Sequence, residues 1–182
     1  MTASNFLACF NETESFEGGY VNDPHDPGGA TLKGVTQAAY NAWRVKQGLP
    51  VQAVRGASDA EIQAIYREQY WNPVRGDDLF VGLDLVMVDY GWGSGPVTAI
   101  RHLQKVLEFS GRDIDGQFGL ETLGAVNTIS SHYAQINFIN RLCDDRTTFF
   151  RSLATWVYFG RGWTVRLNGI RAKALAMNAA AT

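Results

Sequence analysis

Residues 16–36 read FEGGYVNDPHDPGGATLKGVT and place one glutamate, Glu17, directly before two glycines. In the preceding segment, residues 5–17, apolar side chains recur at steps of three and four, which predicts an amphipathic helix. Glycine readily adopts the left-handed conformation that ends a helix, so Gly18 is the expected stop. We therefore expect Glu17 in the last helical turn or at its end.

A carboxyl group at that place has an unusual electrostatic setting. The C-terminus of a helix carries partial negative charge, and aromatic neighbours such as Phe16 and Tyr20 remove water, so both effects raise the pKa of Glu17. A raised carboxyl pKa suits a general acid that works near neutral pH. The alternative is a solvated glutamate at a helix end, which its position alone favours.

Two aspartates follow in a loop rich in proline and glycine. Cleavage of a glycosidic bond usually needs two carboxyl groups, and this loop can supply the second. Asp26 comes nine positions after Glu17, and Thr31 comes fourteen after it. The inverting phage lysozymes have a similar order, with the threonine fifteen positions on, so the chain resembles them with a shift of one residue. Asp23 competes as the second acid, although an aspartate before proline also caps turns.

The rest of the chain reads as mostly helical. It has 182 residues, 46% of them apolar and 19% charged, which suits one globular domain or one domain with a small appendage. Helices are expected at residues 36–47, 58–71, 83–90, 97–109, 120–129 and 133–155, followed by a basic terminal helix. Convincing strands are missing, apart from a small β-hairpin that residues 20–36 could hold. The strongest break, GWGSGP at 91–96, suggests a catalytic region at 1–90 and a helical region at 91–182 packed on it.

Longer motifs extend this pattern: EGGY at 17–20, NDP at 22–24, DPGGAT at 26–31, GVT at 34–36, IYR at 65–67 and YW at 70–71. Together they resemble the signature of glycoside hydrolase family 108. Residues 103–119 resemble the predicted peptidoglycan-binding region that accompanies that domain, and FGRGW at 159–163 is similar to the family's end. The resemblance implies a mainly α, lysozyme-like fold and N-acetylmuramidase activity, with Glu17 catalytic. Several members were first described as secretion activator proteins.

The expected reaction is hydrolysis of the β-1,4 bond between N-acetylmuramic acid and N-acetylglucosamine. Glu17 would protonate the glycosidic oxygen, Asp26 would activate a water on the opposite face of the sugar, and Thr31 would help to position that water. This arrangement predicts inversion, with carboxyl groups about 6.5–9.5 Å apart. Two other classes stay open: a non-catalytic cell-wall-binding or secretion-helper protein, and a lytic transglycosylase, which needs one acid.

Further residues are candidates for holding the glycan. Aromatic rings at the end of the third expected helix could line a sugar cleft, but the same spacing serves core packing equally well. The candidate substrate-binding residues are Tyr20, Asp23, Thr36, Tyr66, Tyr70 and Trp71.

No metal and no organic cofactor are expected. Cys9 and Cys143 lie far apart and have no metal-ligand spacing. Residues 113–116 are similar to a calcium loop, but Gly111 and Thr122 would then stand at the end positions that need carboxylates. The expected partner is the glycan strand of peptidoglycan, and a net charge of -2 does not suggest nucleic acid.

The expected place of action is the bacterial cell wall, in the periplasm or outside the cell. The sequence has no typical secretory signal and no run of apolar residues long enough for stable membrane insertion. We therefore expect synthesis in the cytoplasm, and a separate holin or export partner for release, as for a phage endolysin.

Overall fold

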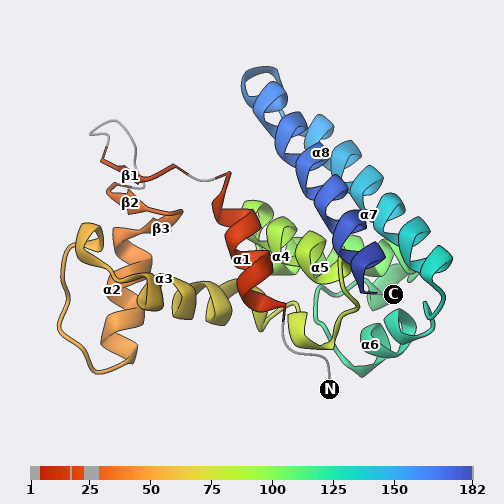
Figure 1. The fold of residues 1–182 in the computed structure, drawn as a ribbon, viewed down its shortest axis with the longest axis horizontal. Helices are drawn as coiled ribbons and strands as arrows, with labels where there is room; N and C mark the ends of the chain where they lie inside the picture. The colour runs from red at the N-terminus through yellow and green to blue at the C-terminus, as the bar shows by residue number, and fades with distance from the viewer. Residues whose placement is uncertain (1–4, 17, 23–28, 182) are drawn as a thin grey trace.

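The computed structural model describes residues 5–16, 18–22 and 29–181, and Figure 1 shows how their helices and strands are arranged. Helices dominate, so the expected mainly helical, lysozyme-like fold is confirmed. The helices are α1 (Phe6–Glu14), α2 (Gln37–Lys46), α3 (Asp59–Tyr66), α4 (Leu83–Ser94), α5 (Pro96–Val106), α6 (Leu120–Asn127), α7 (His132–Ser152) and α8 (Trp156–Ala180). Short helical segments are η1 (Val54–Gly56), the π-helical η2 (Arg67–Trp71), η3 (Gly76–Asp78) and η4 (Gly111–Asp113).

The molecule has two lobes with α1 between them (Figure 1). The sheet lobe contains α2, α3 and the strands β1 (Tyr20–Val21), β2 (Thr31–Leu32) and β3 (Val35–Thr36). The helical lobe contains α4 to α8. The three strands form one antiparallel sheet in the order β1-β2-β3, one strand more than the expected hairpin. None of the helices within the described ranges is long and apolar enough to cross a membrane.

Local sequence signals account for several helix boundaries. A capping box begins α3, since the Ser58 side chain accepts from the Glu61 backbone N–H at 3.3 Å and the Glu61 carboxylate accepts from the Ser58 N–H at 2.9 Å. The Thr36 hydroxyl accepts from the Ala39 N–H at 3.2 Å and caps α2 in the same way. The first helix ends at Glu14, three residues before the expected position. The backbone N–H groups of Ser15 and Phe16 donate to the carbonyls of Asn11 and Thr13 in the turn that follows.

Helix α4 is the centre of the core. Every residue from Leu83 to Gly91 is buried, including Asp84 and Asp89, and apolar side chains lie on all sides of the helix, as is typical inside a protein. It packs against α1, α5, α7 and α8, so one buried cluster draws on both halves of the sequence. The predicted break at 91–96 is wrong in its first part, because α4 continues to Ser94 and the chain turns only at Gly95. The division at residue 90 itself stays a prediction.

Helices α7 and α8 form a long antiparallel hairpin that stands out from the helical lobe (Figure 1). The aromatic segment 156–164 is the beginning of α8. Near the other end of α8, the Asn178 side chain donates to the Val81 carbonyl at 2.8 Å and to the Gln135 side chain at 2.9 Å. The base of the hairpin is thereby fixed to the segment that leads into α4.

Candidate active site

The three predicted acids, Glu17, Asp23 and Asp26, lie outside the described residues. Their roles therefore stay predictions, and the structure describes the residues that precede and follow them in the sequence. The segment between Val21 and Thr31 contains both aspartates, and its two ends are paired across β1 and β2. Both ends of this acidic loop are thus held at the spacing of neighbouring strands, at the edge of the sheet lobe that follows α1.

Phe16, the residue before Glu17, is held by α8. Its backbone N–H donates to the Thr13 carbonyl at 3.3 Å, which continues the end of α1. The Arg166 guanidinium lies 5.5 Å from the centre of the Phe16 ring, within the range of a cation–π contact. A Cβ atom at Gly169 would lie 2.8 Å from the tip of the same ring, so the absence of a side chain there makes room for Phe16.

Arg166 is in turn fixed by a buried carboxylate. Two of its nitrogens donate to one oxygen of Asp89 at 3.0 and 2.7 Å, and Arg146 donates to the other at 2.7 Å. Asp89 and Arg146 are almost completely buried. A buried charge needs paired, well-directed hydrogen bonds to be tolerated, and both oxygens of the Asp89 carboxylate receive them. A series of contacts thus leads from Asp89 in α4 through Arg166 to Phe16, the residue before the predicted acid.

A second set of contacts ties the end of α1 to the sheet lobe. The Lys33 ammonium, in the turn between β2 and β3, lies 2.8 Å from Glu14 and 2.9 Å from Asp59. Hydrogen bonds to Asp59 and then Glu14 raise the pKa of Lys33, so it keeps its charge in this place. Position 17 is therefore preceded by residues that are linked to both lobes, Glu14 to the sheet lobe and Phe16 to the helical lobe.

The predicted threonines and Tyr20 all lie in the small sheet. Thr31 is half-buried, faces Val21 and Thr36 in the strand register, and donates to the Gly29 carbonyl at 3.3 Å. The hydroxyl of Thr36 is occupied as the cap of α2. Tyr20 is 39% exposed, with the Arg55 guanidinium 5.3 Å from its ring centre. Tyr20 is therefore accessible to a substrate, while the roles of all three stay predictions.

The predicted aromatic residues of α3 and η2 separate into two groups. Tyr66 and Trp71 are each only 1% exposed and pack against Phe6, which corresponds to the core use of this stripe. Burial also raises the pKa of Tyr66. Tyr70 is only partly buried and contacts Trp92 at a ring-centre distance of 4.7 Å. Of the three, Tyr70 alone is partly accessible to solvent.

Two residues near the site were not among the sequence candidates. Trp92 was assigned to a junction between halves, and its ring packs on Tyr66 at 5.0 Å and beneath the turn at Gly34. Arg166 was counted only as part of a basic helix. A tryptophan between two glycines could have indicated that the Trp92 ring packs closely against a backbone segment. No pattern in the sequence indicates that Arg166 pairs with Asp89.

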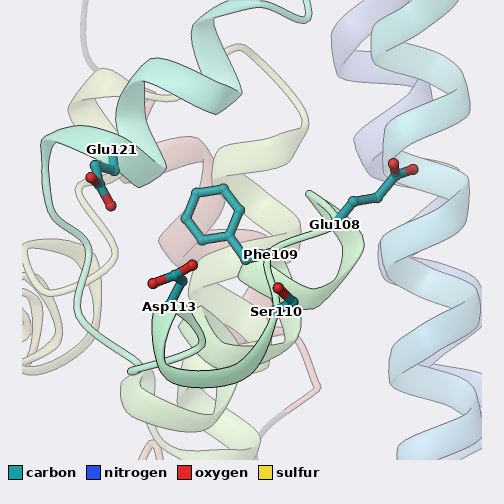
Figure 2. A pocket seen from close by; sticks show the side chains of 5 residues that line it. All are labelled: Glu108, Phe109, Ser110, Asp113 and Glu121. Atoms are coloured by element: carbon teal, nitrogen blue, oxygen red, sulfur yellow. The ribbon is translucent and has the colours of Figure 1, made fainter.

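A cavity lies beside the segment that resembles a peptidoglycan-binding region. It has a volume of about 310 Å³, and Figure 2 shows the Phe109 ring beside Asp113 and Glu121, with Ser110 nearby and the Glu108 side chain pointing away. The loop is stabilised by a buried amide, since Gln104 donates to the Asp115 carboxylate at 2.8 Å and accepts from the Gly116 N–H at 2.9 Å. The hydrogen bond from Gln104 lowers the pKa of Asp115. Three acidic residues, Glu108, Asp113 and Glu121, line this cavity.

Comparison with known proteins bears on the whole chain. The sequence profile of glycosyl hydrolase 108 matches residues 10–95, which include Glu17, Asp26 and Thr31. A search of curated proteins gave no match. The solved structure of Brucella abortus SagA is similar over 96% of this chain and 95% of that chain, with 40% sequence identity and a TM-score of 0.79. With that identity over almost the full length of both proteins, the chain belongs to glycosyl hydrolase family 108.

Proposed function

We propose that this protein is a peptidoglycan hydrolase that cleaves the β-1,4 bond between N-acetylmuramic acid and N-acetylglucosamine. The observation that supports the proposal is the motif EGGY at 17–20, which lies inside the match to family 108 and follows Glu14 and Phe16, the residues that contact the two lobes. A glycosidase must hold its acid at a fixed place relative to the bond that breaks, and the contacts of these two preceding residues support such a fixed place.

In the proposed reaction Glu17 donates a proton to the glycosidic oxygen as the bond breaks. Asp26 removes a proton from a water on the opposite face of the sugar, and that water attacks the anomeric carbon with inversion. Thr31 is proposed to position the water. Its place in β2, directly after the acidic loop in the sequence, supports this role, because the β1–β2 pairing holds Thr31 opposite Val21, the strand residue that precedes the loop. Asp23 is the competing base.

Tyr20 and Tyr70 are the predicted aromatic residues best suited to contact the glycan, because Tyr20 is exposed and Tyr70 is only partly buried. The peptidoglycan of the bacterial wall is the proposed partner, reached from the cytoplasm with the help of a separate holin or export system. Neither step of the proposed hydrolysis requires a metal or an organic cofactor.

The test is product analysis with matched variants. Purified protein should clear a peptidoglycan suspension and release new reducing ends, and Glu17→Gln should lower the rate by about 10²–10⁴-fold, because it removes the acid. Glu12→Gln is the control, since Glu12 lies earlier in the chain, in α1, and pairs with Lys173 at the surface. Full activity in a folded Glu17→Gln protein would show that another group supplies the proton.

The same experiment separates the other candidates. Comparing Asp26→Asn with Asp23→Asn identifies the base, because only the base should match the loss seen at Glu17. Anhydromuramic ends in the mass spectrum would indicate a lytic transglycosylase. Binding to insoluble peptidoglycan without any released product would favour a cell-wall-binding or secretion-helper protein.

A further inference from the structure

The end of the α7–α8 hairpin exposes large apolar side chains. We call residues 151–165 the hairpin tip. Within it Val157 is 77% exposed, Tyr158 80%, Phe159 55% and Val165 63%. The hairpin stands away from the rest of the helical lobe (Figure 1). Exposed apolar side chains gathered at one place usually mark a surface that another partner covers.

The arrangement of these side chains limits what that partner can be. Val157, Tyr158 and Phe159 are consecutive in a helix, so they point in directions about 100° apart and cover about half of its circumference. A partner helix or a second copy of this chain would bury one stripe, with apolar residues three and four apart. An apolar surface that extends around the end of a hairpin instead suits a deformable partner that can contact several sides of it at once.

The tip is also rich in aromatic rings that have a polar edge. Trp163 stands at the centre of this group, with ring centres 6.1 Å from Trp156 and 5.7 Å from Phe159. Tyr158 lies beside Phe159 at 6.5 Å. Tryptophan and tyrosine concentrate where a bilayer meets water, because one part of each ring is apolar and the other forms hydrogen bonds.

The charge of this region has one sign. After Asp145 the chain contains six arginines and lysines, and no aspartate or glutamate up to its last residue. Four of the cations have acidic partners: Arg146 and Arg166 pair with Asp89, Arg171 with Asp144, and Lys173 with Glu12.

The other two cations belong to the hairpin tip. Arg151 and Arg161 are exposed, and no carboxylate in the described parts of the chain pairs with either. The Arg151 guanidinium lies 5.9 Å from the Trp156 ring, so a positive charge accompanies the aromatic surface. An anionic surface is the complementary partner for such a tip.

We propose that the hairpin tip docks on the surface of a lipid bilayer rich in anionic phospholipid. The exposed apolar side chains enter the headgroup region, and Arg151 and Arg161 contact the phosphates. The contact is interfacial, because no helix in the described structure can cross the membrane. Docking requires nothing of the glycosidase site and stands independently of the proposed hydrolysis.

The test is flotation of the full-length protein with vesicles, at about 0.1 M salt. Vesicles that contain phosphatidylglycerol should bind the protein, and pure phosphatidylcholine vesicles should bind it much less. Replacing both arginines, Arg151→Gln with Arg161→Gln, should weaken binding by about thirtyfold, since each basic residue near an anionic surface contributes about fivefold. Raising the salt should weaken binding of the parent protein, because the attraction is screened.

A composition-matched pair of variants tests the apolar contribution. The tip triple variant is Val157→Ser, Tyr158→Ser and Val165→Ser. Its control is Val45→Ser, Val51→Ser and Tyr133→Ser, which removes the same residue types at sites that are 65%, 60% and 76% exposed elsewhere. Only the tip triple should lose vesicle binding. Arg101→Gln with Arg112→Gln is the matched charge control, since both arginines are exposed and lie outside the tip.

Several outcomes would overturn the proposal. Equal binding to neutral and anionic vesicles would remove the role of the arginines, and equal losses in the two triple variants would remove the role of the tip. If the tip variants lost binding to insoluble peptidoglycan and not to vesicles, the partner would be the wall. If they changed only the mass measured by sedimentation equilibrium, the partner would be a second copy. Should the tip triple fail to fold, the arginine pair decides.

Discussion

At the scale of single residues, the pair of arginines on Asp89 shows how the interior is constrained. Asp89 comes from α4, Arg146 from α7 and Arg166 from α8, so one carboxylate joins three helices. Arg146 also lies 4.8 Å from the ring centre of Tyr90 and 5.2 Å from that of Phe150, which fills the space around its charge. Removing one cation leaves the carboxylate with a single partner away from water.

We predict that Arg146→Met lowers the free energy of unfolding by about 3 kcal/mol, because breaking a buried ion pair from one side is costly. Urea unfolding followed by circular dichroism measures the change. Arg112→Met is the matched control, and as an exposed substitution it should change stability by less than about 0.5 kcal/mol. A similarly small effect for Arg146→Met would mean that Arg166 alone satisfies Asp89.

At the scale of elements, the turn between β2 and β3 fixes the sheet lobe to the core. Lys33 and Gly34 both have positive φ angles, 48° and 74°, which is the geometry of a tight two-residue hairpin. A Cβ atom at Gly34 would lie 1.9 Å from an atom of the Trp92 ring. The strands therefore approach α4 as closely as a backbone without a side chain allows.

We predict that Gly34→Ala destabilises the protein more than Gly48→Ala does. Gly48 has a φ of 70° but nothing within 4 Å of its added Cβ, so its substitution costs only the left-handed strain, about 1–2 kcal/mol. At Gly34 the clash with Trp92 should add about 1–3 kcal/mol to that strain. Urea unfolding of both variants measures the difference, and equal losses would show that the Trp92 ring moves aside freely.

At the scale of the whole molecule, the buried cluster does not stop at the middle of the sequence. Phe6, Tyr66 and Trp71 from the first half share it with Leu103 and Leu142 from the second. Helix α4 supplies its centre and extends past residue 90. A chain cut there would expose apolar surface on both pieces.

We predict that a fragment of residues 1–90 does not fold cooperatively on its own, because it loses the end of α4 and its contacts with α5, α7 and α8. Thermal unfolding followed by circular dichroism tests this, with the full-length protein as the control. A sharp transition in the fragment would establish residues 1–90 as an independent domain.

Much of the fold could be predicted because its signals are local. The helical spacing of apolar residues, the capping box at Ser58–Glu61 and the apolar run at 83–90 each indicated a helix that is present. The break at 91–96 was misplaced, since glycines usually end helices but are tolerated inside one where packing is tight. Gly91 is buried in the core, and tertiary contacts override its low helix propensity.

The surroundings of the site could be predicted only in part. The loop motif marked where to look, but the pairs Glu14–Lys33 and Asp89–Arg166 join residues that are far apart in sequence. Such pairs leave no periodic or spacing signal in a single chain. The aromatic stripe at 66–71 shows the same limit, because ring spacing alone does not separate a core face from a substrate-binding face.

Because a Cβ at Gly169 would lie 2.8 Å from the Phe16 ring, we expect these two distant positions to vary together among relatives. A side chain at 169 would take the place of the ring, and a smaller residue at 16 would leave α8 with a gap. Relatives that keep an aromatic residue before the glutamate should therefore keep glycine on the last helix, and a change at one position should appear with a change at the other. A position in the C-terminal helix should therefore vary together with the residue before the predicted acid, although none of the residues in that helix has a proposed part in the chemistry.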